Sequence, residues 1–310
     1  MGISILLILF YHTGIAFFGD VGVELFFVLS GIGLTFSLSK TYCIKDFLKK
    51  RFVRIIPTYL AVVIPASIIY RDRLQTGILS TIFQIDTIKG SMGFMTWWFI
   101  VMICFLYLIA PLLYRIKSIK SHVSIGVLVA LLFFFSFGYL DKWPINVAFL
   151  LRLPIVVMAI PLGKYLLLNS IPKGNSWGAF FVCLFVSLIF VTTVYLLKLN
   201  YIITPWNLQI IFLIYFFAAL PLLVLSAYSL QFIEDRLGGA ILLRLFNFLG
   251  SITLELYLVH EYFCKEIASY ICTYWLASAL LSIIIAMFVA YVLHVCMNRL
   301  IQISFNDKVK

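Results

Sequence analysis

The chain alternates long apolar runs with short polar connections along its whole length. A helix needs about 20 mostly apolar residues to cross about 30 Å of hydrocarbon, and charged residues, prolines and glycines mark where each run ends. The pattern predicts ten membrane-spanning helices, over residues 3–18, 21–38, 55–70, 97–114, 123–140, 147–168, 178–197, 208–228, 245–263 and 274–297. The long connection over residues 71–96 leaves room for a surface or re-entrant helix.

Composition supports a membrane protein over a soluble one. Hydrophobic residues make up 64% of the chain and charged residues only 11%, whereas a soluble domain averages about 25% charged. We therefore expect an all-α polytopic protein in which residues 1–310 form a single membrane-embedded domain, with no soluble extracellular domain. The six cysteines are scattered through apolar runs without a C-x-x-C pair, so neither a zinc site nor a disulfide framework is predicted.

The net charge of +11 predicts the orientation of the helices. In a soluble chain this excess would suggest nucleic acid, but in a membrane chain cations accumulate in cytoplasmic segments. With a cytoplasmic N-terminus and strict alternation, the inner segments hold sixteen cations and four anions, and the outer segments hold six of each. The sequence thus predicts that both termini are cytoplasmic, in a multi-pass protein of the cytoplasmic membrane that binds no nucleic acid.

A few polar side chains lie within the predicted spans, where an ionised group costs at least about 2.5–3.5 kcal/mol. They are His12, Glu24, Arg152, Glu255 and His260. All except Glu255 fall in the outer half of their helices, which predicts a polar cavity there. Structural alternatives stay open. A neutral histidine can hydrogen-bond a neighbouring helix, Glu24 suits a helix N-terminus, and the arginine and glutamates can neutralise one another.

Two arginines at the predicted inner face form a separate candidate site. Arg51 and Arg54 are three residues apart, so they share one face of a helix. They suit a bidentate phosphate clamp, but they also suit a topology anchor attracted to anionic lipid headgroups, and their spacing does not decide between these. His122 and His294 lie at inner helix ends without ligand-like partners, and we assign them no function.

Residues 22–31, Gly-Val-Glu-Leu-Phe-Phe-Val-Leu-Ser-Gly, resemble the G-V-[DE]-x-F-F-x-x-S-G signature of the acyltransferase-3 family, integral-membrane enzymes that modify cell-surface glycans and lipids. Further motifs match in order along nearly the whole chain: His12 in the first helix, Arg51, Arg54 and Pro57 as R-x-x-R-x-x-P, Trp98, Phe99, Tyr107 and Pro111 as W-F…Y…P, Arg152, Pro154 and Gly163 as R-x-P…G, and residues 250–260 as G…[ST]-x-x-x-Y-L-x-H.

The resemblance implies about ten helices with both termini cytoplasmic, and transfer of an acyl group from cytosolic acyl-CoA, most often acetyl-CoA, to a glycan hydroxyl at or beyond the outer face. It implies that His12 is the catalytic base and that Arg51 and Arg54 contact the phosphates of CoA, with no metal. Our hypothesis adds that Glu24 or Glu255 orients the imidazole and that Arg152 stabilises an oxyanion or orients the sugar. The residues expected to line the cavity are Ser30, Trp98, Glu255, Tyr257 and His260.

Two positions depart from the family pattern. The family usually has an arginine eleven residues before its first-helix histidine, where this sequence has Met1; either translation starts further upstream or this member lacks that arginine. Ile103 stands where some branches carry a glutamate.

Expected partners are the glycan or glycolipid acceptor, membrane lipid and glycan-assembly proteins. Two other functions remain as alternatives. One is a transporter or flippase for a lipid-linked glycan, although no internal repeat of the kind common in transporters is evident. The other is an inactive scaffold relative.

Overall fold

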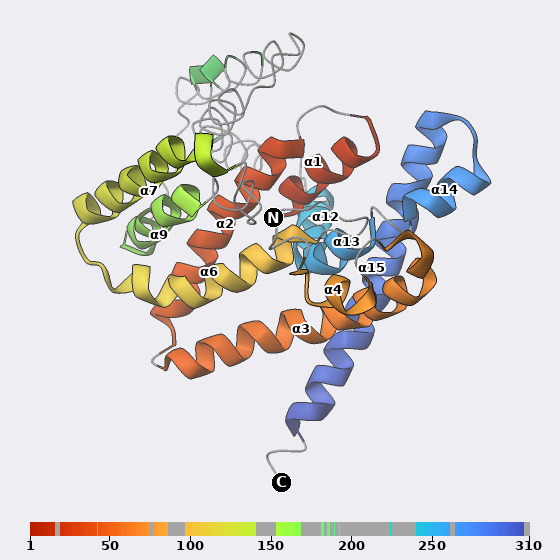
Figure 1. The fold of residues 1–310 in the computed structure, drawn as a ribbon, viewed down its shortest axis with the longest axis horizontal. Helices are drawn as coiled ribbons and strands as arrows, with labels where there is room; N and C mark the ends of the chain where they lie inside the picture. The colour runs from red at the N-terminus through yellow and green to blue at the C-terminus, as the bar shows by residue number, and fades with distance from the viewer. Residues whose placement is uncertain are drawn as a thin grey trace.

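The structure is a computed structural model that describes residues 1–15, 19–41, 43–74, 77–85, 97–140, 153–168, 240–260 and 264–306, with a few isolated positions between 181 and 224. No strand occurs in these segments (Figure 1). The helices are α1 (Gly2–His12), α2 (Gly19–Ser39), α3 (Ile44–Ile69), the 3-10 helix η1 (Arg71–Arg73), α4 (Ile78–Ile82), α6 (Trp98–Arg115), α7 (Ile119–Leu140), α9 (Leu153–Leu168), α12 (Ala240–Ser251), α13 (Thr253–Val259), α14 (Lys265–Ile271) and α15 (Trp275–Asn306).

Four of the described helices, α2, α3, α6 and α15, are long and apolar enough to cross a membrane, and α12 with α13 adds a fifth if that bent pair is one span. The prediction of an all-helical membrane protein is therefore confirmed. The count of ten spans and the cytoplasmic termini stay predictions. The seventh and eighth predicted spans, over 178–197 and 208–228, lie almost wholly outside the described residues.

Helix α3 begins eleven residues earlier than its predicted span, at Ile44 rather than residue 55. The hydropathy pattern missed this part because it is rich in lysine and arginine. It is nevertheless amphipathic, with Phe47 only 1% exposed, and Asp46 in the first turn interacts favourably with the helix dipole. Arg51 and Arg54 consequently lie well inside a long helix, on the shared face expected from their spacing.

The ninth predicted span, 245–263, is broken in the structure. Helices α12 and α13 meet at Ile252 with a bend of 65°. The Thr253 hydroxyl donates hydrogen bonds to the carbonyls of Leu249 at 2.8 Å and Gly250 at 2.9 Å. Side-chain hydroxyls that bond to nearby carbonyls compete with the helix ladder and favour bends.

The 71–96 connection contains two short helices, η1 and α4. The Tyr59 hydroxyl of α3 donates a hydrogen bond to the carbonyl of Ile82 at 3.0 Å. The Gln84 side chain accepts one from the backbone N–H of Trp97 at 2.9 Å. These two bonds hold the connection against α3 and the start of α6, although residues 86–96 lie outside the described part of the chain.

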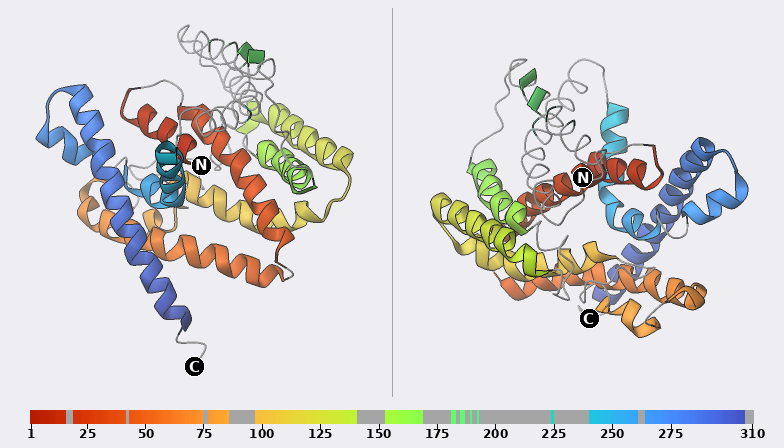
Figure 2. Two further views of the ribbon diagram at one scale, coloured as in Figure 1. Left: turned by 180° about the vertical axis from the view of Figure 1, so that it is seen from behind. Right: turned by 45° about the horizontal axis from the view of Figure 1, so that its top comes forward.

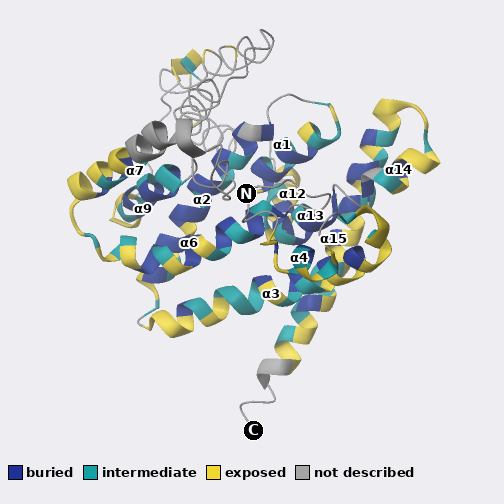
Figure 3. Cartoon of the chain, viewed as in Figure 1, coloured by how far each residue is buried: buried dark blue, intermediate teal, exposed yellow. Residues whose placement is uncertain are grey.

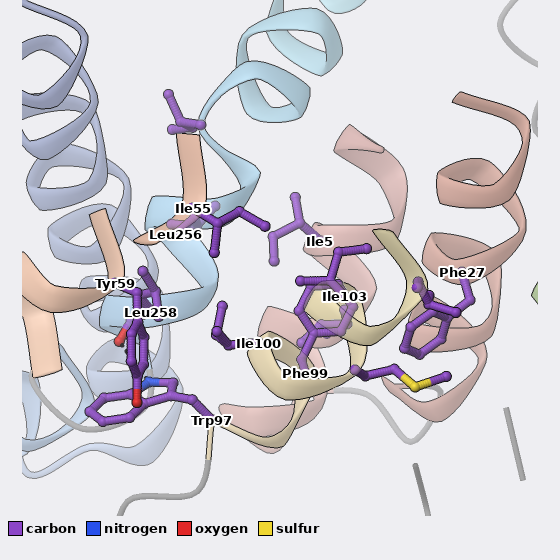
Figure 4. Packing of buried hydrophobic residues seen from close by; sticks show 14 of the residues in the cluster. Ile5, Phe27, Ile55, Tyr59, Trp97, Phe99, Ile100, Ile103, Leu256 and Leu258 are labelled. Atoms are coloured by element: carbon purple, nitrogen blue, oxygen red, sulfur yellow. Dashed lines mark hydrogen bonds between the residues drawn. The ribbon is translucent and has the colours of Figure 1, made fainter. Parts of the chain in front are cut away.

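The buried core lies where α1, α2, α3, α6 and α13 meet, and apolar side chains on the outer faces of the helices are exposed (Figure 3). Figure 4 shows the packing, to which each of these helices contributes a side chain at most 4% exposed: Ile5, Phe27, Ile55, Ile103 and Leu256. The long helix α15 crosses the end of this bundle and packs against α3 and α13 (Figures 1 and 2). Helix α15 therefore places side chains from the C-terminal part of the chain beside α3.

Small residues allow α2 and α9 to pack closely. A Cβ atom added to Gly31 of α2 would lie 2.5 Å from the Cβ of Ala159, and one added to Gly163 of α9 would lie 2.8 Å from the Cβ of Thr35. The Thr35 hydroxyl donates to its own helix and lies 3.3 Å from the carbonyl of Ile160. Small residues and cross-helix hydrogen bonds of this kind drive helix association in membranes.

Gly31→Ala is therefore expected to lower the stability of the detergent-solubilised protein, by about 1–3 kcal/mol because overpacking forces the backbones apart. Thermal unfolding measures the effect. Gly33→Ala is the matched control, because Gly33 lies on the same helix, is exposed, and has nothing within 4 Å of an added Cβ. Equal melting temperatures for the two variants would contradict the close packing of α2 on α9.

Candidate active site

Two histidines from distant parts of the chain meet in the bundle. His12 ends α1, and His260 follows α13 directly. Their ring centroids are 4.9 Å apart in an edge-to-face arrangement. The Nδ1 atom of His260 lies 3.1 Å and 2.8 Å from two carbonyl oxygens one turn earlier in α13. Carbonyls only accept, so Nδ1 carries the proton and Nε2 is the acceptor of the neutral ring. Both residues are candidates on the sequence alone, but only the fold brings them together.

Aromatic rings extend from the histidine pair. The ring of Tyr257 lies 6.0 Å from that of His260 and 5.0 Å from that of Phe99. Phe99 in turn contacts its neighbour Trp98 at 6.2 Å and Phe26 of α2 at 4.8 Å. Two of the residues expected to line a cavity, Tyr257 and Trp98, thus belong to one aromatic cluster beside the histidines.

Three other predicted site residues are Glu24, Ser30 and Arg152, and the structure describes the first two. Glu24 is fully buried in α2, and Ser30 is 7% exposed on the same helix. Burial of a carboxylate within a membrane helix is costly, so Glu24 remains a functional candidate. Arg152 lies outside the described residues. Its roles as oxyanion ligand or structural ion partner therefore stay predictions.

Glu255 belongs to a buried charge network. Its Oε1 atom lies 2.6 Å from Nη2 of Arg54 and 3.1 Å from Nδ1 of His294. The carboxylate is fully buried, and the Arg54 side chain is 31% exposed. Our expectation that His294 has no ligand-like partner is wrong. It failed because His294 and Arg54 are 240 residues apart, and only the crossing of α15 over α3 joins them. The sequence held one sign of this network, because a buried glutamate in a membrane helix requires a cationic partner.

Arg51 has different neighbours from Arg54. Its guanidinium carbon lies 5.6 Å from the ring centre of Phe47 and 5.7 Å from that of Tyr107. Such cation–π contacts orient a guanidinium without neutralising it. Among the described residues no carboxylate pairs with Arg51, whereas Glu255 offsets the charge of Arg54. The two arginines share a helix, but among the described residues only Arg54 has a carboxylate partner.

A second polar cluster caps the end of α6. The ammonium of Lys164 donates to the carbonyls of Tyr114 at 2.7 Å and Ile116 at 2.6 Å. The ring nitrogens of His122 lie 3.1 Å from the carbonyl of Ser118 and 3.0 Å from that of Leu113. Carbonyls in the last turn of a helix lack helical partners, so Lys164 and His122 have a structural role here.

A third cluster ties the connection after α3 to α14. The Tyr70 hydroxyl donates a hydrogen bond to Glu266, and Nη1 of Arg73 lies 3.0 Å from Oε1 of the same carboxylate. The hydrogen bond from Tyr70 and the charge of Arg73 hold the pKa of Glu266 below its ordinary value. The cluster is partly exposed, and none of its members is a predicted site residue, so it contributes little more than local order.

Taken together, these elements define a multi-pass helical membrane protein with a histidine pair and an arginine pair in one bundle. No group of three or more potential metal ligands occurs among the described residues. The chain matches the family described as an acyltransferase domain over residues 2–295, nearly its whole length, and belongs to that acyltransferase-3 family. Acyl transfer is therefore its reaction class. No curated protein and no solved structure matches the chain.

Proposed function

We propose that this protein transfers an acetyl group from cytosolic acetyl-CoA to a hydroxyl of a cell-surface or exported glycan. The observation that carries the proposal is the contact between His12 and His260, 4.9 Å apart in a membrane-embedded bundle. Imidazole is the side chain best suited to proton transfer near neutral pH. Family membership supplies the acyl transfer, and the histidine pair supplies a base for it.

Helix α13 connects the histidine pair to the arginines that would bind the donor. It carries Glu255, the partner of Arg54, and is followed by His260 five residues later, which corresponds to about 7.5 Å along a helix axis. Phosphates held near the arginines would therefore lie on one side of the histidine pair, and the pantetheine arm would bring the thioester toward it. On the predicted orientation the arginine end is cytoplasmic, which suits a charged donor that cannot cross the membrane.

In the proposed reaction His12 accepts the proton of the acceptor hydroxyl. The hydroxyl oxygen then forms a bond to the carbonyl carbon of the thioester, the carbon–sulfur bond breaks, and the proton passes to the CoA thiolate. The buried carboxylate of Glu24 would orient the imidazole, and Arg152 would stabilise the oxyanion or orient the sugar. Ser30, Trp98 and Tyr257 would line the acceptor cavity.

Mass spectrometry of the surface glycan in a deletion strain tests this function. We expect the glycan polymer to persist without its acetyl mass, and complementation with the wild-type gene to restore that mass. Loss of the polymer itself would contradict the proposal and favour export of a lipid-linked glycan.

At the donor end, Arg51→Ala is expected to raise the KM for acetyl-CoA about tenfold to a hundredfold, because a charge-assisted hydrogen bond contributes about 1.5–3 kcal/mol. Arg51 is the better phosphate ligand of the two arginines because no described carboxylate offsets its charge. Steady-state kinetics in detergent measure the change. Lys50→Ala is the control, since it removes one exposed cation from the same helix. Equal effects of both variants would favour a general surface charge instead of a clamp.

A further inference from the structure

Helix α15 places two polar side chains against the ion pair of Arg54 and Glu255. His294 contacts Oε1 of Glu255 through Nδ1 at 3.1 Å, and the amide nitrogen of Asn298, one turn later, lies 2.9 Å from Nε2 of His294. Nη2 of Arg54 also lies 3.0 Å from Nδ1 of His294. Four side chains from α3, α13 and α15 thus form one continuous network.

The contacts of Asn298 select one tautomer of His294. The amide nitrogen can only donate, so Nε2 of the imidazole is the acceptor and Nδ1 of the neutral ring carries the proton. That proton is then donated to Oε1 of Glu255. A protonated Nδ1 cannot also accept from Arg54, so the two nitrogens, 3.0 Å apart, are both donors to the shared acceptor Oε1 of Glu255. Asn298 therefore directs the single imidazole donor at the carboxylate.

The ion pair itself needs this support because it is held through one oxygen. Arg54 and Glu255 meet through Nη2 and Oε1 only. Oε2 of Glu255 and Nη1 of Arg54 are buried and have no hydrogen-bond partner among the described residues. A bidentate arginine–carboxylate pair fixes its own geometry, but a pair joined through one oxygen can rotate about that contact. The hydrogen bond from His294 to the same oxygen removes this freedom.

We propose that His294 and Asn298 are positioning residues that hold the Arg54 guanidinium for the acyl donor by fixing the carboxylate of Glu255. The inference rests on the proposed function, in which Arg54 contacts the phosphates of CoA. It gives the last long helix a role in donor binding that its apolar sequence does not suggest.

The test is a double-mutant cycle on the purified full-length protein, with acetyl-CoA as the varied substrate and binding of CoA measured by titration calorimetry. His294→Ala in the wild-type background is expected to raise the KM for acetyl-CoA and the Kd for CoA about threefold to tenfold, with kcat changed less than twofold. In the neutral background Arg54→Met with Glu255→Leu, the same substitution should change neither constant. An equal loss in both backgrounds would overturn the proposal.

Three further variants on α15 test the separate roles of His294 and Asn298. His294→Asn keeps an amide donor near the position of Nδ1 and should restore most of the affinity for CoA. Asn298→Ala should weaken CoA binding in the same direction as His294→Ala, because the tautomer is no longer selected. Gln302→Ala, an exposed amide one turn beyond Asn298, should leave the constants at wild-type values. Absence of rescue by His294→Asn, or a Gln302→Ala effect as large as that of Asn298→Ala, would contradict the assignment.

The same measurements distinguish this inference from the proposed function. A wild-type protein that binds no CoA and transfers no acetyl group would overturn both. A wild-type protein that binds CoA and transfers acetyl, but shows additive losses in the cycle, would overturn only the positioning role of His294 and Asn298.

Discussion

His12→Ala is expected to abolish acetylation of the surface glycan while the protein remains folded in the membrane. General-base catalysis contributes about 10²–10⁴-fold to a rate, so the product should fall below detection in cells. His12 lies at the last turn of α1 with its ring against His260, and its removal leaves the buried α1 residues Ile5 and Leu9 in place. The measurement is glycan mass spectrometry in the deletion strain complemented with each variant.

The His12→Ala result is compared with a neighbouring substitution at the end of α1. Tyr11→Phe changes the neighbouring residue, which is 40% exposed, and removes only a hydroxyl; it should retain acetylation. Membrane protein levels are compared by immunoblot so that loss of activity is not loss of protein. Acetylation at the wild-type level in His12→Ala, with equal protein, would exclude His12 as the base.

Arg54→Ala is expected to destabilise the protein by about 3–5 kcal/mol, because it leaves the buried carboxylate of Glu255 without its cation. The Glu255 side chain is fully buried and its closest polar contact is Nη2 of Arg54 at 2.6 Å. His294 alone cannot replace a full positive charge while neutral. The expected signs are a lower melting temperature in detergent and less protein in the membrane fraction.

The double variant Arg54→Met with Glu255→Leu separates stability from donor binding. Replacing both buried charges by apolar side chains is often neutral or stabilising, so the melting temperature should return toward that of the wild type. The affinity for CoA should not return, because the guanidinium is absent. If Arg54→Ala alone melted at the wild-type temperature, the buried ion pair would not contribute to stability.

The long apolar helices were predictable from the sequence because burial in lipid needs only a continuous apolar stretch. The second predicted span, 21–38, agrees with α2 (Gly19–Ser39), and the fourth, 97–114, agrees with α6 (Trp98–Arg115). Prediction failed where a helix continues in polar sequence, as α3 does before residue 55. It also failed at Thr253, where a side-chain hydroxyl bends an otherwise apolar run.

The sequence by itself determined the membrane class, the family motifs and most of the candidate residues, because hydropathy and motif spacing are local properties of a chain. The tertiary structure alone decided which candidates meet. His12 joins His260, while Glu255 joins Arg54 and His294. The physical reason is that a buried charge requires a partner, but the sequence does not say which helix crossing supplies it.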